Sequence, residues 1–182
     1  MVSDDGRVAA GFAQQGGLDR TPAVWNADGT GFLLDPAEQN TPAEVLSISA
    51  DGAMVAGVFG LEDGFLWTKE AGMVKLGPLP GGEAGQPVYP NAIAAGTKLV
   101  FGGVGDPFMT VPTAFVWTSS QGMRALSDLA AAQGVAIPAG YQLTVVLAAS
   151  ADGTVLLGVA YDEKGRQKTF VLRLPASAYG LP

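Results

Sequence analysis

The sequence contains no cysteine and no histidine among its 182 residues. Without cysteine the chain forms no disulfide, has no thiolate nucleophile and offers no sulfur ligand to zinc. Without histidine it lacks the side chain that most often serves as a general base and metal ligand near neutral pH. Zinc and haem are therefore not expected. Flavin and nucleotide cofactors are not expected either, and Gly81-Gly82 lacks the following Lys-Ser/Thr of a phosphate loop. The metal that fits the remaining oxygen ligands is a hard cation such as Ca²⁺.

Charged side chains are also scarce, at 15% of the residues, and the net charge is −7. Binding to nucleic acid needs clustered lysine and arginine, so nucleic acid is not an expected partner. No apolar run reaches the 18 residues of a membrane-spanning helix, so no membrane span is expected. The first residues lack the basic and apolar regions of a signal peptide.

The chain is rich in turn-forming residues, with 26 glycines and 12 prolines, and its apolar runs are short, which favours an all-β fold. A Ser-x-Asp-Gly motif recurs between pairs of these runs. Asp-Gly predicts a β-hairpin with a type I′ turn, because glycine adopts positive φ without steric cost. The expected structural turn residues are Gly6, Asp51, Gly52, Asp152 and Gly153, with Gly96 in a degenerate fourth copy.

The four turn glycines are spaced by 46, 44 and 57 residues, a period typical of four-stranded propeller blades. In each repeat, strand A precedes the turn glycine and strand B follows it. A strand C that is rich in aromatic residues comes next, at 22–25, 64–67, 113–117 and 169–172, and a short turn leads from it to strand D. We expect these aromatics to pack between blades. The prediction is one β-propeller-like repeat domain over residues 1–182, built from four antiparallel blades at about 1–41, 42–87, 88–140 and 141–182.

Both ends of this array are incomplete. Residues 1–3 leave room for only a short first strand, and the last repeat has no copy of the Gly-Met-x-x-Leu strand D that closes the two middle repeats. We therefore expect 15 strands and an open ring. Exposed blade edges favour pairing with another chain, which predicts a homodimer through these edges.

These motifs resemble those of the bacterial extracellular repeat proteins of the HAF family. The resemblance rests on the Ser-x-Asp-Gly hairpins, the Ala-Phe-x-Trp strand at 114–117 and the Gly-Met-x-x-Leu strands at 72–76 and 122–126. It covers nearly the whole chain and implies a propeller-like fold and a secreted or cell-surface location. The His-Ala-Phe triplet that names the family lacks its histidine in every repeat here, so no role of that histidine carries over.

The acidic residues concentrate on one predicted face. The loops that join strand B to C and strand D to A hold eleven acidic and four basic side chains, so this loop face carries the whole net charge. Bound Ca²⁺ would relieve the repulsion, although acidic loops also serve solubility alone. The candidate calcium ligands are Glu62, Asp63, Asp106, Asp162 and Glu163; Asp19, Asp35 and Glu38 belong to the same face.

Two tyrosines are candidates for contacts with a ligand on the loop face. Tyr89 belongs to a Pro-Gly-rich loop at 78–90, which is either a plain connection or the lining of a pocket, and Tyr161 precedes Asp162. A short helix is predicted at 127–134, with caps at Ser127 and Gly134. It is either decoration of a loop or a lid over a pocket.

Three functions fit these residues. The favoured one is a binding or interaction module that holds a small molecule or a protein on its loop face and needs no catalytic histidine or cysteine. The alternative is a calcium-dependent hydrolase of small lactones or esters, with Asp106 or Asp162 as the catalytic base; it requires the acidic candidates to converge on one ion. A structural part of a larger surface protein is the third. Whether the chain is an enzyme stays open.

Overall fold

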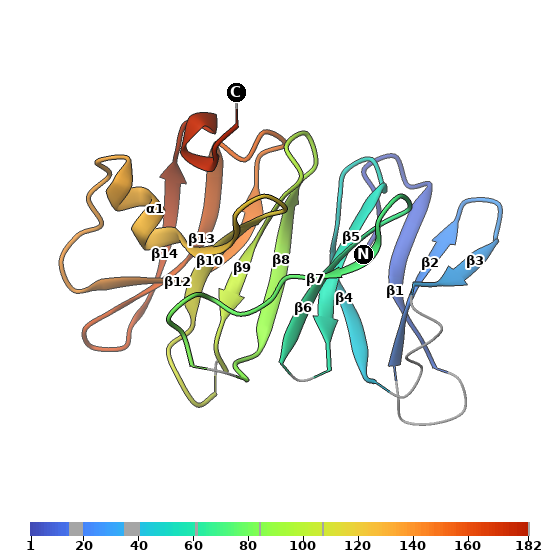
Figure 1. Cartoon of the computed structure of the whole chain (residues 1–182), viewed down its shortest axis with the longest axis horizontal. Coiled ribbons are helices and arrows are strands. Elements are labelled where there is room, and N and C mark those ends of the chain that lie inside the picture. The colour runs from blue at the N-terminus through green and yellow to red at the C-terminus, as the bar shows by residue number, and fades with distance from the viewer. Residues whose placement is uncertain (15–19, 35–40, 61, 84, 107, 182) are drawn as a thin grey trace.

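Four antiparallel sheets lie side by side in a row in the computed structural model, which describes residues 1–14, 20–34, 41–60, 62–83, 85–106 and 108–181 (Figure 1). Consecutive strands pair within each sheet, as in a propeller blade. The first and fourth sheets lie at opposite ends of the row, so the ring is open. The predicted all-β, open propeller-like fold is confirmed.

The sheets are named blades 1 to 4. Blade 1 consists of β1 (Val8–Gln14), β2 (Arg20–Asn26) and β3 (Gly31–Leu33), and blade 2 of β4 (Ala43–Ile48), β5 (Met54–Phe59), β6 (Asp63–Thr68) and β7 (Gly72–Lys75). Blade 3 consists of β8 (Val88–Ala94), β9 (Leu99–Val104), β10 (Thr113–Thr118) and β11 (Gly122–Ala125), and blade 4 of β12 (Tyr141–Ala149), β13 (Val155–Asp162) and β14 (Gln167–Arg173). The helix α1 (Leu126–Ala132) joins blades 3 and 4, and the 3-10 helix η2 (Ala176–Tyr179) follows β14.

The structure therefore describes 14 strands where the sequence predicts 15. The difference lies at the N-terminus, where residues 1–3 form one isolated bridge, from Val2 to Ala9, in place of the predicted strand A of blade 1. Strands β1, β2 and β3 are therefore strands B, C and D of that blade. Blade 4 has three strands in the described part of the chain, as the absence of a last Gly-Met-x-x-Leu motif predicts.

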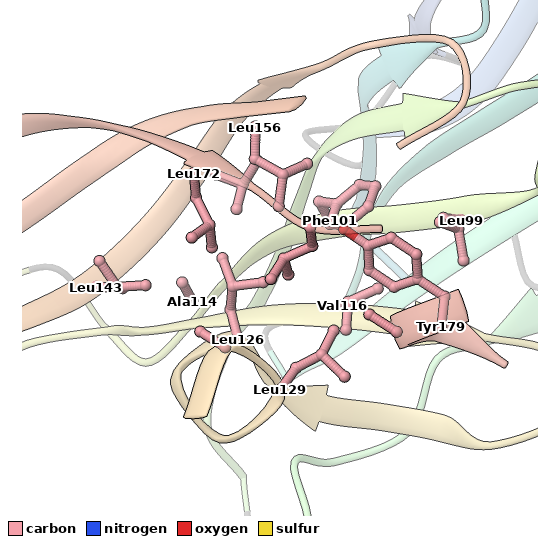
Figure 2. Close-up of a cluster of buried hydrophobic side chains, with 14 of the residues drawn as sticks. Leu99, Phe101, Ala114, Val116, Leu126, Leu129, Leu143, Leu156, Leu172 and Tyr179 are labelled. Atoms are coloured by element: carbon pink, nitrogen blue, oxygen red, sulfur yellow. The ribbon is translucent and has the colours of Figure 1, made fainter. Parts of the chain in front are cut away.

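The core lies between blades, in three apolar clusters. In strand C of blade 2, Phe65 and Trp67 pack toward blade 1 while Leu66 packs toward blade 3, because successive side chains of a strand point to opposite faces. Figure 2 shows the cluster between blades 3 and 4, to which Phe101 and Leu156 contribute from facing sheets. The aromatic strands of blades 2, 3 and 4 thus pack between blades, as predicted. In blade 1 the prediction is wrong, because Trp25 is 39% exposed and belongs to none of these clusters.

A glycine in strand B of blades 2, 3 and 4 lets two strands approach closely. A Cβ atom at Gly57, Gly102 or Gly158 would overlap a carbonyl oxygen of the neighbouring strand A. Strand A carries a bulge beside each of these glycines, which brings its backbone toward strand B. The glycines therefore have a packing reason that is independent of any site.

The hairpin turns differ from the predicted type I′. In the turn of blade 2, Gly52 donates its N–H to the carbonyl of Ser49 at 2.9 Å, and positive φ occurs at Gly52 alone, at 71°. A β-turn is thus followed by one left-handed residue, so the hairpin loop has four residues. In blade 3, Thr97 takes the place of Gly52, and the positive φ of 55° falls on Lys98. The assignment of Gly96 as the repeat glycine was wrong.

The predicted helix begins earlier than expected. Helix α1 starts at Leu126, and its N-terminus receives no side-chain cap, so the prediction that Ser127 caps it is wrong. Gly134 ends the helix with φ of 72°, and Val135 donates its N–H to Ala130 at 2.9 Å. The helix buries Leu126, Leu129 and Ala130 in the cluster between blades 3 and 4, so it is part of the core.

Candidate functional site

The two ends of the blades differ in chemistry. The A–B and C–D turns lie at one end, and the B–C and D–A loops lie at the other, because every blade is an antiparallel meander. The end with the turns is built from repeated hydrogen bonds, whereas the loop face has two separate cavities that four of the five candidate calcium ligands line.

The Ser-x-Asp-Gly motif forms the same hydrogen bonds in blades 1, 2 and 4. In blade 2 the Ser49 hydroxyl donates to Asp51 Oδ1 at 2.6 Å and accepts the backbone N–H of Met54 at 2.8 Å. The same carboxylate oxygen accepts the backbone N–H of Ala53 at 3.0 Å. All four groups of the turn are satisfied locally, which is sufficient reason for the acid at this position.

These hydrogen bonds lower the pKa values of the turn carboxylates. Those from Ser150 and from the backbone of Thr154 lower the pKa of Asp152 to about 2. The pKa values of Asp5 and Asp51 are lowered for the same reason. These three acids stay ionised at neutral pH and serve their own turns.

The turn of blade 4 is also held by the C-terminal segment. The Tyr179 hydroxyl donates to the carbonyl of Gly153 at 2.8 Å in a buried position. Burial, with a smaller contribution from the charge of Asp152, raises the pKa of this phenol above its ordinary value. The ring of Tyr179 packs edge-on against Phe101, with the ring centroids 5.9 Å apart.

The loop face has a cavity of about 420 Å³ between blades 2 and 3. Three carboxylates line it, from Glu62, Asp63 and Glu83, next to the apolar side chains of Leu79 and Val111. We call it the acidic cavity. One cation lies beside it, since Lys75 Nζ is 3.3 Å from Asp63 Oδ2. The cavity combines apolar lining with negative charge, which suits a ligand that carries a positive group.

The other predicted calcium ligands lie elsewhere. Asp162 and Glu163 line a separate hollow of about 170 Å³ on blade 4, next to Lys164 and Arg166. Asp162 is engaged by its own loop, because its Oδ1 accepts the backbone N–H of Arg166 at 2.9 Å and its Oδ2 accepts the side-chain Nε–H of Arg166 at 2.7 Å. The backbone hydrogen bond from Arg166 is the largest cause of the lowered pKa of Asp162.

Asp106 also serves its own loop, where its Oδ1 accepts the N–H of Phe108 at 2.8 Å. Among the described residues, no three or more acidic side chains form a group that could hold a metal ion. Asp19, Asp35 and Glu38 lie outside the described residues. The calcium site and the hydrolase that depends on it stay predictions.

Both candidate tyrosines line cavities. Tyr89 lies in β8, so its placement in the predicted loop at 78–90 is wrong. It borders a cavity of about 230 Å³ together with Leu46 of β4 and Val145 of β12. Tyr161 borders one of about 480 Å³, together with Val111 and Leu147. The predicted ligand contacts thus fall in different cavities and make no single site.

Sequence reasoning missed Glu83 and Gln86 as neighbours of Glu62. Gln86 Nε2 donates to Glu83 Oε2 at 3.3 Å, and both line the acidic cavity. The available signal was the Pro-Gly-rich loop at 78–90, which lines the pocket as one of its two interpretations suggested. Only the fold shows that this loop crosses from blade 2 to blade 3 beside Glu62.

Comparisons with solved structures place the chain among propellers. It is similar to a protein assigned as TolB from Agrobacterium tumefaciens, with 14% identity and a TM-score of 0.57 over 94% of this chain and 64% of that one. TolB from Acinetobacter baumannii is also similar, with 14% identity and a TM-score of 0.50 over 95% of this chain and 42% of that one. A chain of the mitotic checkpoint complex gives 18% identity and a TM-score of 0.50 over 93% and 47%.

These likenesses show the fold, and the chain spans only part of each of those proteins. No known family profile and no curated protein matches it. The resemblance to the HAF family stays a prediction. No helix in the described part of the chain is long and apolar enough to cross a membrane.

Proposed function

We propose that the chain is a propeller-type binding module whose loop face holds a ligand with a positively charged group. The observation that carries the proposal is the acidic cavity, where three carboxylates gather beside apolar side chains at the junction of two blades. Ligand sites are concave, are lined largely by apolar groups and use a few polar groups for specificity. The cavity combines apolar side chains, from Pro78, Leu79, Val104 and Val111, with these three carboxylates.

The charges around the cavity define the ligand class. Asp63 has Lys75 as a counter-charge, whereas Glu62 and Glu83 are exposed at the cavity. A primary amine or guanidinium, on a small molecule or on a lysine or arginine of a protein, would pair with these carboxylates. Ca²⁺ is the other cation that the oxygen ligands permit, and it needs six to eight of them.

The test is a thermal melt with defined probes. We expect an alkyl diamine to raise the melting temperature, because a ligand that binds only the folded state stabilises it by about 2.7 kcal/mol at 100 times its Kd. The double variant Glu62→Gln with Glu83→Gln should lose this shift. The matched control is Glu70→Gln, an exposed residue in the C–D turn of blade 2. An equal shift in both variants would contradict the proposal.

The same melts decide the calcium prediction. A shift in millimolar Ca²⁺ that is absent in Mg²⁺ and reversed by EDTA would support a calcium site on the loop face, and assays of lactone and ester hydrolysis would follow. A shift with the diamine alone would leave the module without a metal. We also propose a secreted or cell-surface location, supported by the family resemblance and tested by fractionation of the cells that make the protein.

A further inference from the structure

Strand β14 has one unpaired edge. In blades 2 and 3, strand C pairs with strand B on one side and with strand D on the other; β14 pairs with β13 alone in the part of the chain that is described. The register matches β14 to β6 residue by residue, because Phe65 lies opposite Gly57 and Phe170 lies opposite Gly158. Each position of the missing strand is therefore defined by blade 2.

The free edge presents hydrogen-bonding groups. In blade 2, Leu76 of the strand D segment donates its N–H to the carbonyl of Gly64 at 2.8 Å. The residue of β14 that corresponds to Gly64 is Thr169. Leu174, just after β14, donates its N–H to the carbonyl of Thr154, just before β13, at 2.9 Å. Successive residues of a strand direct their backbone N–H and C=O groups to opposite sides. Residues 172, 170 and 168 therefore face β13, and Thr169 and Val171 direct their backbone groups away from it.

The charge at this edge is reversed relative to blade 2. There, Asp63 in strand C pairs with Lys75 in strand D at 3.3 Å. In blade 4, the residue that corresponds to Asp63 is Lys168, which is exposed. A strand that occupies the position of strand D therefore needs a carboxylate where blade 2 has Lys75.

The surroundings of Lys168 strengthen this requirement. Residues 164–173 contain four of the ten basic residues of the chain and no acidic residue, although the net charge of the chain is −7. Arg166 is paired with Asp162, and Lys164 lies in the turn before β14 next to the exposed Glu163. On the strand itself Lys168 and Arg173 are both exposed, and an acidic segment would be attracted to them.

We propose that the edge of β14 accepts an extended acidic segment of a partner protein, which completes blade 4 as its fourth strand. The segment has apolar side chains at the positions of Met73 and Leu76 and a carboxylate at the position of Lys75. Such strand addition binds through backbone hydrogen bonds and selects through alternate side chains. This surface lies outside the acidic cavity, so the proposal goes beyond the one above.

A second copy of the chain fits this edge less well. Antiparallel pairing of two β14 strands would bring two copies of Lys168 and Arg173 into one sheet, and like charges across strands are destabilising. Lysine on an edge strand is a known means of preventing such self-pairing. The charges that oppose a second β14 attract an acidic strand.

The experiment uses two fluorescent peptides that copy residues 71–77 of this chain, one with the native Lys75 and one with Lys75→Glu. Binding is followed by fluorescence anisotropy with the unaltered protein and with Lys168→Glu. We expect the peptide with glutamate to bind the unaltered protein about fivefold more tightly than the peptide with lysine, as for one exposed ion pair. The preference should reverse in Lys168→Glu.

Two controls separate strand addition from charge attraction and from the acidic cavity. N-methylation of the peptide leucine that corresponds to Leu76 removes the hydrogen bond to Thr169 and should abolish binding. The variant Glu62→Gln should bind both peptides as the unaltered protein does, so failure here is distinguishable from failure at the cavity. Absence of binding at millimolar peptide, or binding that ignores both charge and N-methylation, would overturn the proposal. A dimer in sedimentation that the peptide disrupts would identify a second copy as the occupant and also overturn it.

Discussion

Blades 2 and 4 share one strand pattern but differ in their neighbours. Leu66 and Val171 occupy the same position in strand C; Leu66 is 6% exposed and Val171 is 63% exposed. Ala56 and Leu157 form a second matched pair in strand B, at 0% and 41%. Blade 2 is covered on both faces, whereas the described residues cover only one face of blade 4. The repeated sequence pattern specifies the strands of a blade, whereas contact with a neighbouring blade determines which of its side chains are buried.

The edges of the two blades differ in the same way. In blade 2 the charge of Asp63 is balanced by Lys75 on the adjacent strand. In blade 4 the corresponding Lys168 lies next to β13 on one side, and no strand of the described residues lies on its other side. The same position of strand C therefore carries opposite charges in the two blades, a carboxylate where strand D is present and an ammonium group where the described residues form no strand D.

The largest expected effect tests the buried face. Leu66→Ala should lower the free energy of unfolding by about 2–4 kcal/mol, because it leaves a cavity in the core between blades 2 and 3. Val171→Ala should lower it by less than about 0.5 kcal/mol, since the side chain is already exposed. Urea unfolding at neutral pH measures both. A large loss in Val171→Ala would show that the open face of blade 4 is covered in solution.

A smaller effect tests the turns. Ser49→Ala should lower the free energy of unfolding by about 1–2 kcal/mol, because Ser49 is fully buried and the N–H of Met54 would lose its acceptor. Ser150→Ala, which removes the same hydrogen bonds from a partly exposed turn, should cost about half as much. Equal losses by urea unfolding would show that burial adds nothing to this hydrogen-bond network.

The ion pair across strands C and D should contribute less. Lys75→Ala should lower the free energy of unfolding by about 0.5 kcal/mol, because both side chains of the pair with Asp63 are well exposed. Lys168→Ala should change it by almost nothing. Urea unfolding in low and in high salt measures both, and the effect of Lys75→Ala should shrink as salt screens the pair. A matching loss in Lys168→Ala would mean that β14 already has a partner strand.

The smallest effect is a dependence on pH. The folded-state pKa of Asp152, at about 2, lies below its unfolded value near 4. Its contribution to stability is therefore present above the unfolded pKa and is lost as the pH falls through the folded pKa. The difference in melting temperature between Asp152→Asn and the unaltered protein should be constant from pH 7 to 5 and shrink toward pH 2. A difference that stays constant to pH 2 would contradict the lowered pKa.

Much of the fold was predictable because it depends on local patterns. The Ser-x-Asp-Gly turns and the aromatic strands of about equal spacing mark the blades, and the absence of a last Gly-Met-x-x-Leu strand marks the open edge. The turn type was missed, because Asp-Gly also fits a longer hairpin loop in which the glycine alone has positive φ. The predicted short first strand is one bridge at Val2, an extent that the sequence pattern does not show.

For the candidate site, the sequence predicted which end of the blades carries the acidic loops, but not which residues line one cavity. Blade topology placed the acidic loops together, but which acids share a cavity depends on the path of each loop. Asp106 and Asp162 turn back to bind the backbone of their own loops, an alternative that spacing between repeats does not show. Glu83 lines the same cavity as Glu62 because the segment between β7 and β8 passes from blade 2 to blade 3.

The sequence by itself determined the repeat, the order of strands in a blade and the sign of the charge on the loops, because these follow from alternation, turn chemistry and composition within some tens of residues. Only the tertiary structure decided which apolar faces are buried, which carboxylates meet in one cavity and which strand edge stays free. These properties depend on contacts between blades that lie far apart in the chain, where a residue's neighbours are chosen by packing.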